Sequence, residues 1–300
     1  MVSKTAKFVQ PYRPEDAAAL VQIHNKAFLG NQMRPLSFSR YLNHVIKVEG
    51  QVWTVSDGQG LVGYGYVTPV PGLEDVFDLQ GCIDPAKRRQ GFGNYLLNEI
   101  INDLTVRGSY QLSHAVYSLA SPAALFLQSR QFVVEHVEWQ LLLDNPGHLP
   151  AVSFPAGYRL ATYPVATAVR NFRKLYDAVF HGLPWYQPYT STREVTAELS
   201  DPNNLLFLLD GEKTAGFAWL RMPEPDLGEV EPFGLLPAYQ GKGLGVPFLT
   251  AAIQRLAAQG AEQVRIGAWQ RNERAIHLYQ QVGFKHINTQ TYLAYNLVPG

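Results

Sequence analysis

The chain has 300 residues, of which 46% are hydrophobic and 17% charged, a composition typical of one large or two medium-sized globular domains. Its 25 basic and 25 acidic residues give a formal net charge of zero, which argues against broad, nonspecific binding to nucleic acid or anionic membranes. The apolar runs are too short for a membrane span, the N-terminus lacks an apolar signal stretch, and the lone Cys82 cannot form an internal disulfide. We therefore expect a cytoplasmic protein in which Cys82 is a buried small hydrophobic residue.

Three segments of the first half recur in the second half at a nearly constant spacing. The segment 83–93, IDPAKRRQGFG, resembles 235–245, LLPAYQGKGLG, at an offset of 152 residues (235 − 83), and Phe132 precedes Phe284 by the same distance. Upstream, Asp57 of SDGQGLVGYGYV matches Asp210 of LDGEKTAGFAWL at an offset of 153. Such registration indicates a tandem duplication.

The boundary between the two copies is expected in the segment 144–157, DNPGHLPAVSFPAG. This segment contains three prolines and two glycines and lacks a helical period. We therefore predict one repeat over residues 1–147 and a second over 148–300.

The second repeat predicts helices interspersed around a mixed sheet. The Asp210–Gly211 pair predicts a hairpin, because this dipeptide favours a two-residue turn between strands. Strands are expected at 157–163, 205–210, 214–222, 228–236, 263–270 and 284–297, and helices at 165–181, 192–200, 243–258 and 272–282. This order is not a strict alternation of strand and helix, so we predict an α/β (α+β) fold.

Gly241, Gly243 and Gly245 lie between an apolar strand and an apolar helix. Glycine clusters of this kind serve either tight turns or loops whose backbone N–H groups approach a phosphate. The N-terminus of the following helix offers unpaired N–H groups and a positive dipole end, which suits an anion. The segment is neither a P-loop nor a dinucleotide fingerprint, since Phe248 stands where the third glycine of the fingerprint belongs.

Two motifs resemble those of the GCN5-related N-acetyltransferase (GNAT) superfamily. The loop reads Q/R-x-x-G-x-G/A at Gln240, Gly243 and Gly245, and N-x-x-A-x-x-L-Y-x-x-x-G-F runs from Asn272 to Phe284. The likeness is closest to tandem members, the mycothiol synthase group, and covers the second half almost entirely and the first half more weakly. It implies two tandem GNAT folds, each with a mixed, mostly antiparallel central sheet flanked by helices, and acetyl-CoA as co-substrate.

The resemblance also implies which residues bind the cofactor. In the second repeat these are Leu235, Leu236, Gln240, Gly241, Lys242, Gly243, Leu244, Gly245 and Asn272. The first repeat keeps an equivalent loop at Ile83, Arg88, Arg89, Gly91 and Gly93 and could also bind CoA. For Asn272, which precedes a predicted helix, the alternative role is an N-cap.

The first repeat has lost the second motif. By the spacing of the second repeat, Tyr279 is matched by Leu127 and Asn272 by Ala120. Because leucine cannot donate a proton, we expect catalysis in the second repeat and a structural or vestigially CoA-binding role for the first.

Acetyl transfer to an amine requires a neutral amine, stabilisation of the carbonyl oxygen and protonation of the leaving thiolate. The resemblance implies Tyr279 as the acid, with a buried core aromatic as the alternative, and a backbone N–H of residues 233–236 for the oxygen. The candidate base is Glu229 or Glu231, and Glu229 takes the position that resembles the glutamate base of the mycothiol synthase group. Glu231 is next in line because residues two apart on a strand share a face, and exposed strand carboxylates are the alternative for both.

The acceptor pocket is expected between the first helices of the second repeat and the loop 180–190. Trp185, Tyr186 and Tyr189 could line this pocket or cover the core, and His181 could bind or relay protons. No paired His or Cys occurs at metal-ligand spacing, so no metal is expected.

The sequence thus favours an acetyl-CoA-dependent N-acetyltransferase, a monomer or homodimer, that acts on a small-molecule amine by direct transfer in a ternary complex. A catalytically idle acyl-CoA-binding or sensing protein is the alternative from another class. A protein or peptide acceptor is a third reading, disfavoured because no acidic substrate tract is evident.

Overall fold

The structure, a computed structural model, describes residues 6–184, 186–199 and 201–297. These residues fall into two units that are not contiguous in sequence. The first contains 6–115, 122–134 and 292–297, and the second contains 116–121 and 135–291. The strand β12 (Lys285–Asn296) is therefore divided, with its beginning in the second unit and its end in the first, and the first two residues of β6 (Val133–Asp144) belong to the first unit.

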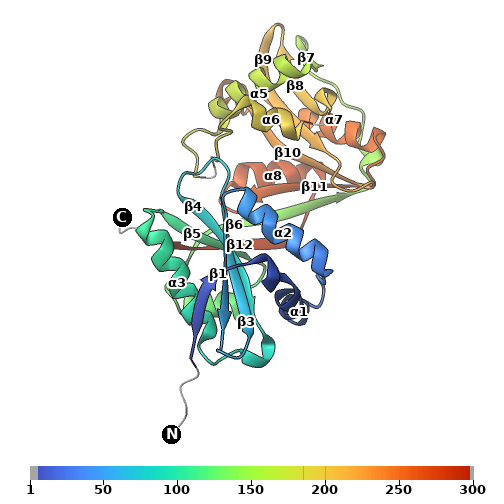
Figure 1. Cartoon of the computed structure of the whole chain (residues 1–300). Helices are drawn as coiled ribbons and strands as arrows, with labels where there is room; N and C mark the ends of the chain where they lie inside the picture. Colours follow the sequence, from blue (N-terminus) through green and yellow to red (C-terminus); the bar gives the residue numbers. More distant parts are fainter. Residues whose placement is uncertain (1–5, 185, 200, 298–300) are drawn as a thin grey trace. The chain divides into compact units, whose positions relative to one another are not determined.

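The first unit is a mixed sheet with helices on both faces. Its elements are β1 (Phe8–Pro11), α1 (Ala17–Ala27), α2 (Pro35–Lys47), β2 (Gln51–Ser56), β3 (Leu61–Pro69), β4 (Val76–Ile83), α3 (Phe92–Val106), β5 (Gln111–Val116) and α4 (Pro122–Gln128). The strand order is β1-β2-β3-β4-β5, antiparallel except for the parallel pair β4–β5. Helices α1 and α2 pack on one face of β3, and α3 lies on the other (Figure 1).

The second unit repeats this arrangement. Its elements are β6 (Val133–Asp144), β7 (Tyr158–Ala161), α5 (Val165–Phe180), α6 (Thr192–Glu198), β8 (Leu205–Asp210), β9 (Lys213–Arg221), β10 (Leu227–Leu235), α7 (Gly245–Ala258), β11 (Gln263–Trp269), α8 (Glu273–Val282) and the beginning of β12 (Lys285–Asn296). The strand order is β6-β11-β10-β9-β8-β7, antiparallel except for the parallel pair β10–β11. The predicted α/β fold with a mostly antiparallel sheet is thus confirmed.

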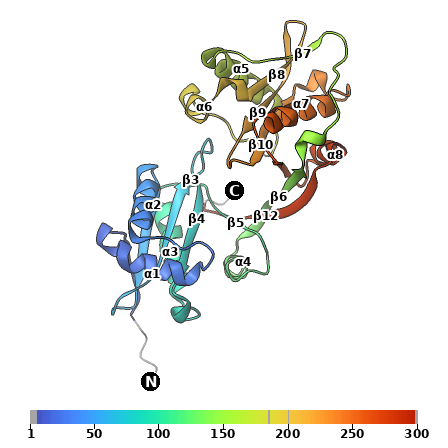
Figure 2. The ribbon, with the colours of Figure 1, turned by 90° about the vertical axis from the view of Figure 1, so that its right-hand side faces the viewer.

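Two apolar clusters hold the helices of the second unit on its sheet. Phe248 of α7 packs with Val264 of β11 in one cluster. Phe172 of α5, Val195 of α6 and Trp219 of β9 form the other. Figure 2 shows α5 and α6 on one side of β8–β10 and α7 and α8 on the opposite side. This division leaves one face of β10 toward α5 and the other toward α8.

The elements expected for the second repeat are confirmed, with differences at their ends. The helix predicted from Gly243 begins at Gly245, because Gly243 has a φ of +74° that no right-handed helix contains. The closing segment is one 12-residue strand rather than several. The structure also shows that β6, which precedes the segment 144–157, pairs with β11 inside the second unit.

The duplication is visible in the backbone of both units. Pairing of β4 with β5 covers Val76–Asp78, and pairing of β10 with β11 covers Leu227–Glu229. The left-handed residues also correspond, since Arg89 and Gly91 have φ of 62° and 85° where Gly241 and Gly243 have 75° and 74°. This agreement is expected if the two units are copies of one fold.

Cys82 is partly buried and packs against the core between α1, α2 and β3. Burial raises the pKa of its thiol to about 12, with opposing contributions from Tyr64 and Arg88. The thiol is therefore protonated near neutral pH, which does not suit a nucleophile.

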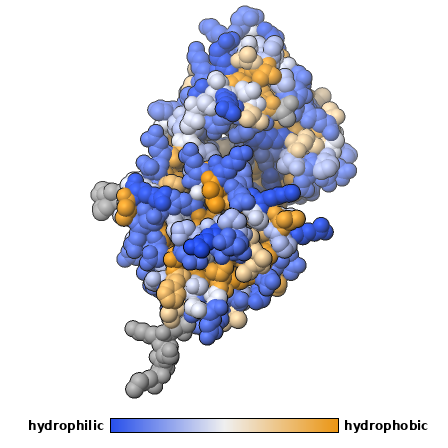
Figure 3. Space-filling view, viewed as in Figure 1, coloured by the Kyte–Doolittle hydropathy of each residue, from blue (hydrophilic) through white to orange (hydrophobic). Residues whose placement is uncertain are grey.

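No helix among the described residues is long and apolar enough to cross a membrane. Polar side chains cover most of the face in Figure 3, and apolar side chains gather there in scattered groups.

Candidate active site

Strands β10 and β11 are paired at one end and separated at the other. The parallel pairs join Leu227–Glu229 to Gln263–Arg265. Beyond this point, the described pairs of β10 are with β9 and those of β11 are with β6. A bulge between Val230 and Phe233 accompanies the separation. The inner edge of β10 thus presents backbone groups to a ligand.

The backbone donors at the end of β10 are directed alternately toward β9 and toward this edge. The N–H of Leu236 donates to the carbonyl of Ala215 at 2.9 Å, so it is already paired on the β9 side. Because donor directions alternate along a strand, the N–H of Leu235 points toward the β11 side. Within the predicted segment 233–236, alternation gives the N–H of Phe233 the same direction, and Leu235 is the candidate nearer to the glycine loop, because Gln240 of that loop bonds its carbonyl.

The loop after β10 has the geometry that its glycines predict. Gly241 and Gly243 have φ of 75° and 74°, a left-handed conformation that favours glycine. A Cβ on Gly243 would meet nothing within 4 Å, so space alone does not require glycine there. A Cβ on Gly245 would lie 3.1 Å from the side chain of Leu278, so this glycine permits close packing of α7 and α8.

Polar contacts hold the loop against α8. The side-chain amide of Gln240 donates to the carbonyl of Leu235 at 2.8 Å and accepts from Arg274 at 2.7 Å. A Cβ on Gly241 would lie 3.8 Å from the Arg274 guanidinium, and the ammonium of Lys242 lies 5.1 Å from the ring centroid of Tyr239. The N-terminus of α7 therefore has two cations beside it, an arrangement suited to a phosphate. Sequence reasoning missed Arg274, although it lies two residues after Asn272 in the second motif.

Asn272 is the N-cap of α8, because its side chain accepts a hydrogen bond from the N–H of Ala275 at 3.3 Å. The capping role is thus confirmed, and a CoA contact stays a prediction.

Tyr279 lies on the buried face of α8. It is 5% exposed, and its ring packs 6.1 Å from that of Phe284 in the core cluster that includes α7. Burial and the charge of Glu231 raise the pKa of the hydroxyl. The hydroxyl therefore keeps its proton near neutral pH. The buried ring fits the alternative role of a core aromatic, and the retained proton is compatible with the role of general acid.

Glu229 is held by two arginines. Arg265 donates to one carboxylate oxygen from Nη2 at 2.6 Å and from Nε at 3.1 Å. Arg221 lies 3.7 Å from the other oxygen and also bonds Glu198 at 3.0 Å. The Glu229 side chain is only 15% exposed, so its charge is already compensated by protein groups.

Glu231 has a different environment, although it lies two residues further along β10. The residue is accessible to solvent, but its carboxylate lies against Gly267 of β11, where a Cβ would be 3.2 Å from Oε2. The protein atoms around the group, then the carboxylates of Glu229 and Glu138, raise its pKa to about 7, against the opposing effect of nearby arginines. This pKa suits proton transfer near neutral pH.

The charge of Glu231 reaches groups on both sides of the sheet. It contributes to the raised pKa of Tyr279 on α8 and, after burial and Tyr189, to the raised pKa of Tyr176 on α5. A ligand between β10 and β11 would therefore lie close to Glu231 and to groups from both faces of the sheet.

The loop expected to form the acceptor pocket is tied to α5. The hydroxyl of Tyr176 donates to the carbonyl of Gln187 at 3.0 Å, and that of Tyr186 donates to Asp177 at 2.8 Å. Tyr189 packs edge-on against the ring of Tyr176 at 5.0 Å, so it covers the core. The ring of His181 lies 5.2 Å from that of Tyr186. Trp185 lies outside the described residues.

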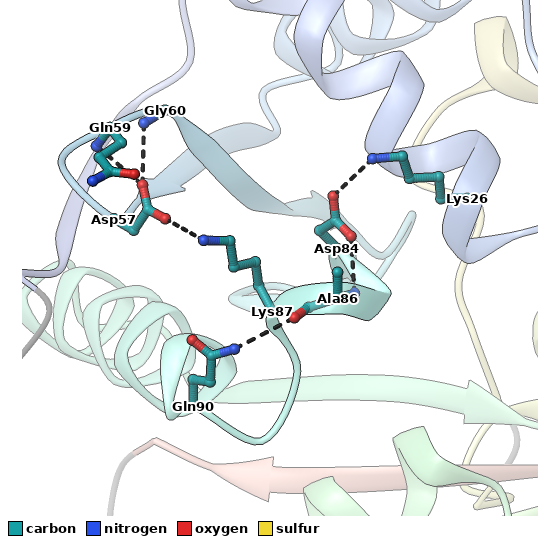
Figure 4. A network of polar contacts seen from close by, with 8 residues as sticks. All are labelled: Lys26, Asp57, Gln59, Gly60, Asp84, Ala86, Lys87 and Gln90. Carbon is teal, nitrogen blue, oxygen red and sulfur yellow. Dashed lines mark hydrogen bonds and ion pairs between the residues drawn. The ribbon is translucent and has the colours of Figure 1, made fainter.

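The first unit keeps the loop without the tyrosine. Arg88 donates to the carbonyl of Ile83 at 3.3 Å, in the position where Gln240 bonds Leu235. Ion pairs of Asp57 with Lys87 at 2.7 Å and of Asp84 with Lys26 at 3.1 Å fix this region (Figure 4).

Leu127, which replaces the tyrosine in the first repeat, is buried. The described residues contain no group of three or more His, Cys, Asp or Glu that could hold a metal ion.

Known proteins resemble this chain in sequence and in fold. Residues 170–284 match the sequence profile of the acetyltransferase (GNAT) family. The chain is 29% identical to a mycothiol acetyltransferase of Corynebacterium glutamicum over 212 residues, which covers 68% of this chain and 70% of the relative. It is also 29% identical to a mycothiol acetyltransferase of Gordonia bronchialis over 234 residues, or 74% of each chain.

Two solved structures have the same fold over almost the whole chain. A GCN5-related N-acetyltransferase from Sphaerobacter thermophilus superposes with a TM-score of 0.72 at 16% identity, covering 100% of this chain and 98% of the other. A tandem GNAT protein from the clavulanic acid biosynthesis pathway gives a TM-score of 0.66 at 15% identity, covering 98% and 100%. At these identities the superpositions concern the fold alone, and they confirm the predicted tandem architecture.

Proposed function

Because the chain belongs to the GNAT family of acetyltransferases, we propose that it transfers an acetyl group from acetyl-CoA to a small-molecule amine in its second unit. One observation carries this proposal. Beside the glycine loop, the separated strands β10 and β11 have a carboxyl group of pKa about 7, that of Glu231, within electrostatic reach of the buried Tyr279.

The proposed reaction is direct and needs no covalent enzyme intermediate. Glu231 takes a proton from the acceptor's ammonium group, and the neutral nitrogen attacks the thioester carbonyl carbon. The N–H of Leu235 stabilises the oxygen as it gains charge. The carbon–sulfur bond then breaks, and Tyr279 gives its proton to the departing thiolate. The nitrogen, which became positively charged on attack, loses its second proton through solvent to the tyrosinate, and this transfer leaves the neutral amide and restores Tyr279.

The resemblance favours Glu229 as the base, but we assign this role to Glu231. Both oxygens of Glu229 already lie beside Arg265 and Arg221, so a proton accepted there would weaken two ion pairs. Glu231 forms no ion pair with the described residues, and its raised pKa makes it a stronger base than an ordinary glutamate. Glu229 then serves to hold the two arginines.

The glycine loop is the proposed site for the CoA pyrophosphate. The N–H groups between Gly241 and Gly245 stand at the N-terminus of α7, with Arg274 and Lys242 as the neighbouring cations. When bound there, acetyl-CoA supplies the activated acyl group. The loop's role is to fix the thioester against β10.

The acceptor is proposed to be a primary amine of a small molecule. Two relatives are named mycothiol acetyltransferase, which supports the amine precursor of mycothiol as the first compound to test.

Gly243→Val is expected to weaken CoA binding at least about tenfold, or roughly 1.4 kcal/mol. A β-branched residue does not adopt the φ of +74° found there without strain, so the loop and its N–H groups must move. The measurement is the dissociation constant of CoA by titration calorimetry, with folding checked by circular dichroism.

Gly91→Val is the matched control, because Gly91 has a φ of +85° at the equivalent place in the first unit. Its turnover should remain largely intact. Unchanged CoA affinity in folded Gly243→Val would exclude the loop as the cofactor site. Loss of turnover in Gly91→Val, with CoA still bound at the second unit, would show that the first unit takes part in catalysis.

A further inference from the structure

Strand β6 brings a histidine and two carboxylates to the edge of the candidate site. Its antiparallel register with β11 sets Glu138 opposite Trp269 and Gln140 opposite Gly267. The imidazole of His136 stacks on the indole of Trp269, with ring centroids 4.1 Å apart and an interplanar angle of 5°. Its Nε2 lies 3.6 Å from Glu138, and its Nδ1 lies 3.4 Å from Glu135.

These groups continue a row that begins at Glu231. The carboxylate of Glu231 lies against Gly267, and Trp269 is two residues further along the same face of β11. Glu138 is the cross-strand partner of Trp269. His136 lies two residues before Glu138, so it shares that face of β6. Glu231, Glu138 and His136 therefore share one face across β10, β11 and β6.

We propose that Glu138 and His136 form a charge pair that sets the protonation state of Glu231 from β6, the strand on the far side of β11. Both are positioning residues, since they act on the substrate only through Glu231. The catalytic consequence rests on the proposed function, but the charge pair itself does not.

The electrostatics of the cluster support this inference. Glu138 contributes to the raised pKa of Glu231. Burial lowers the pKa of His136, but the carboxylates of Glu135 and Glu138 outweigh this effect and raise it above the ordinary value. A protonated imidazole beside Glu138 offsets the effect of that carboxylate on Glu231, and the offset is lost when the imidazole deprotonates.

The other charged and titratable groups near Glu231 come from five elements, including its own strand. They are Arg221 of β9, Glu229 of β10, Arg265 of β11, Tyr176 of α5 and Tyr279 of α8. Glu229 forms ion pairs with both arginines, so their charges largely compensate one another. The pKa of Glu231 should therefore respond to changes of charge on β6 without a large net charge from these other groups.

Two substitutions on β6 should move the titration of Glu231 in opposite directions. Glu138→Gln removes a negative neighbour and should lower the pKa of Glu231 by about half to one unit. His136→Asn removes the compensating positive charge and should raise that pKa by a similar amount. A residue that served packing alone would not give opposite signs.

The measurement is carbon-13 NMR of the full-length chain labelled at the glutamate side-chain carboxyl, with the Glu231 signal assigned from Glu231→Gln. His286→Asn is the control, because the His286 ring packs 4.7 Å from Trp139, whose place on β6 alternates with that of Glu138. It should leave the Glu231 titration unchanged. Where turnover is measured, the acidic limb of the kcat/KM profile should move with the same signs.

Opposite shifts in the two variants support the proposal, and shifts of the same sign, or below about 0.2 unit, overturn it. If His136→Asn does not fold, His136→Gln replaces it, and the sign for Glu138→Gln alone still decides. The NMR titration needs no turnover. Shifted titrations in an inactive protein would contradict the proposed function only, and unshifted titrations in an active enzyme would contradict the charge pair only.

Discussion

Glu231→Gln is expected to lower kcat/KM at neutral pH by about 10²–10⁴-fold, the range for loss of a general base. The carboxylate must be deprotonated to accept the ammonium proton, so kcat/KM of the wild type should fall tenfold per pH unit below the Glu231 pKa of about 7. Glutamine cannot titrate, and the acidic limb should disappear in the variant. The measurement is the pH profile of kcat/KM between about pH 5 and 9.

Glu229→Gln is the matched control, because it makes the same chemical change two residues away on the same strand. Its acidic limb should persist, since the Glu229 carboxylate is held by Arg265 and Arg221. The reverse result, an acidic limb lost in Glu229→Gln and kept in Glu231→Gln, would return the base to Glu229.

The raised pKa of Glu231 also predicts the sign of the change in stability. The folded state binds this proton more tightly than the unfolded chain, so Glu231 lowers the free energy of unfolding progressively as pH rises from about 4.5 to about 7. Glu231→Gln removes that cost, and its melting temperature at pH 8 should not be lower than that of the wild type. An inactive but stable variant would exclude misfolding as the cause of lost turnover.

Tyr279→Phe is expected to reduce kcat by about 10²-fold or more while CoA affinity is retained. The ring packs in the core around α7 and α8, and phenylalanine preserves that packing while removing the only proton that the side chain can give. The measurements are kcat in the presence of saturating amine and the dissociation constant of CoA. Full turnover in Tyr279→Phe would show that the tyrosine serves packing and not proton transfer.

Local features were predictable from the sequence because their causes are local. The hairpin around Asp210–Gly211 follows from turn preference, although its two turn residues are Gly211 and Glu212. The glycine loop follows from its spacing between an apolar strand and an apolar helix, and Gly241 and Gly243 in it are left-handed. The N-cap at Asn272 follows from its place before a helix. The repeat itself was visible as a constant offset.

Features that depend on strand register were not predictable. Alternation assigns Glu229 and Glu231 to one face, but only the register with β9 and β11 gives Glu229 its two arginines and sets Glu231 against Gly267. The pairing of β6 with β11 joins a strand before the expected boundary to the second unit. No local sequence pattern predicts such a pairing, so Glu138 and His136 were not identified as neighbours of the site. Gly245 was assigned to the phosphate site, whereas the structure shows that it also admits Leu278.

Amine-dependent release of free thiol from acetyl-CoA separates an acetyltransferase from a protein that only binds acyl-CoA. The assay should use the full-length chain, acetyl-CoA and a panel of small amines that includes the mycothiol precursor, amino sugars and polyamines, with the acetylated product identified by mass spectrometry. We expect thiol release that requires one of these amines in the wild type and in Gly91→Val, and its loss in Gly243→Val. Tight binding of acetyl-CoA to the second unit, with thiol release that no amine accelerates, would contradict acetyl transfer and identify an acyl-CoA-binding protein.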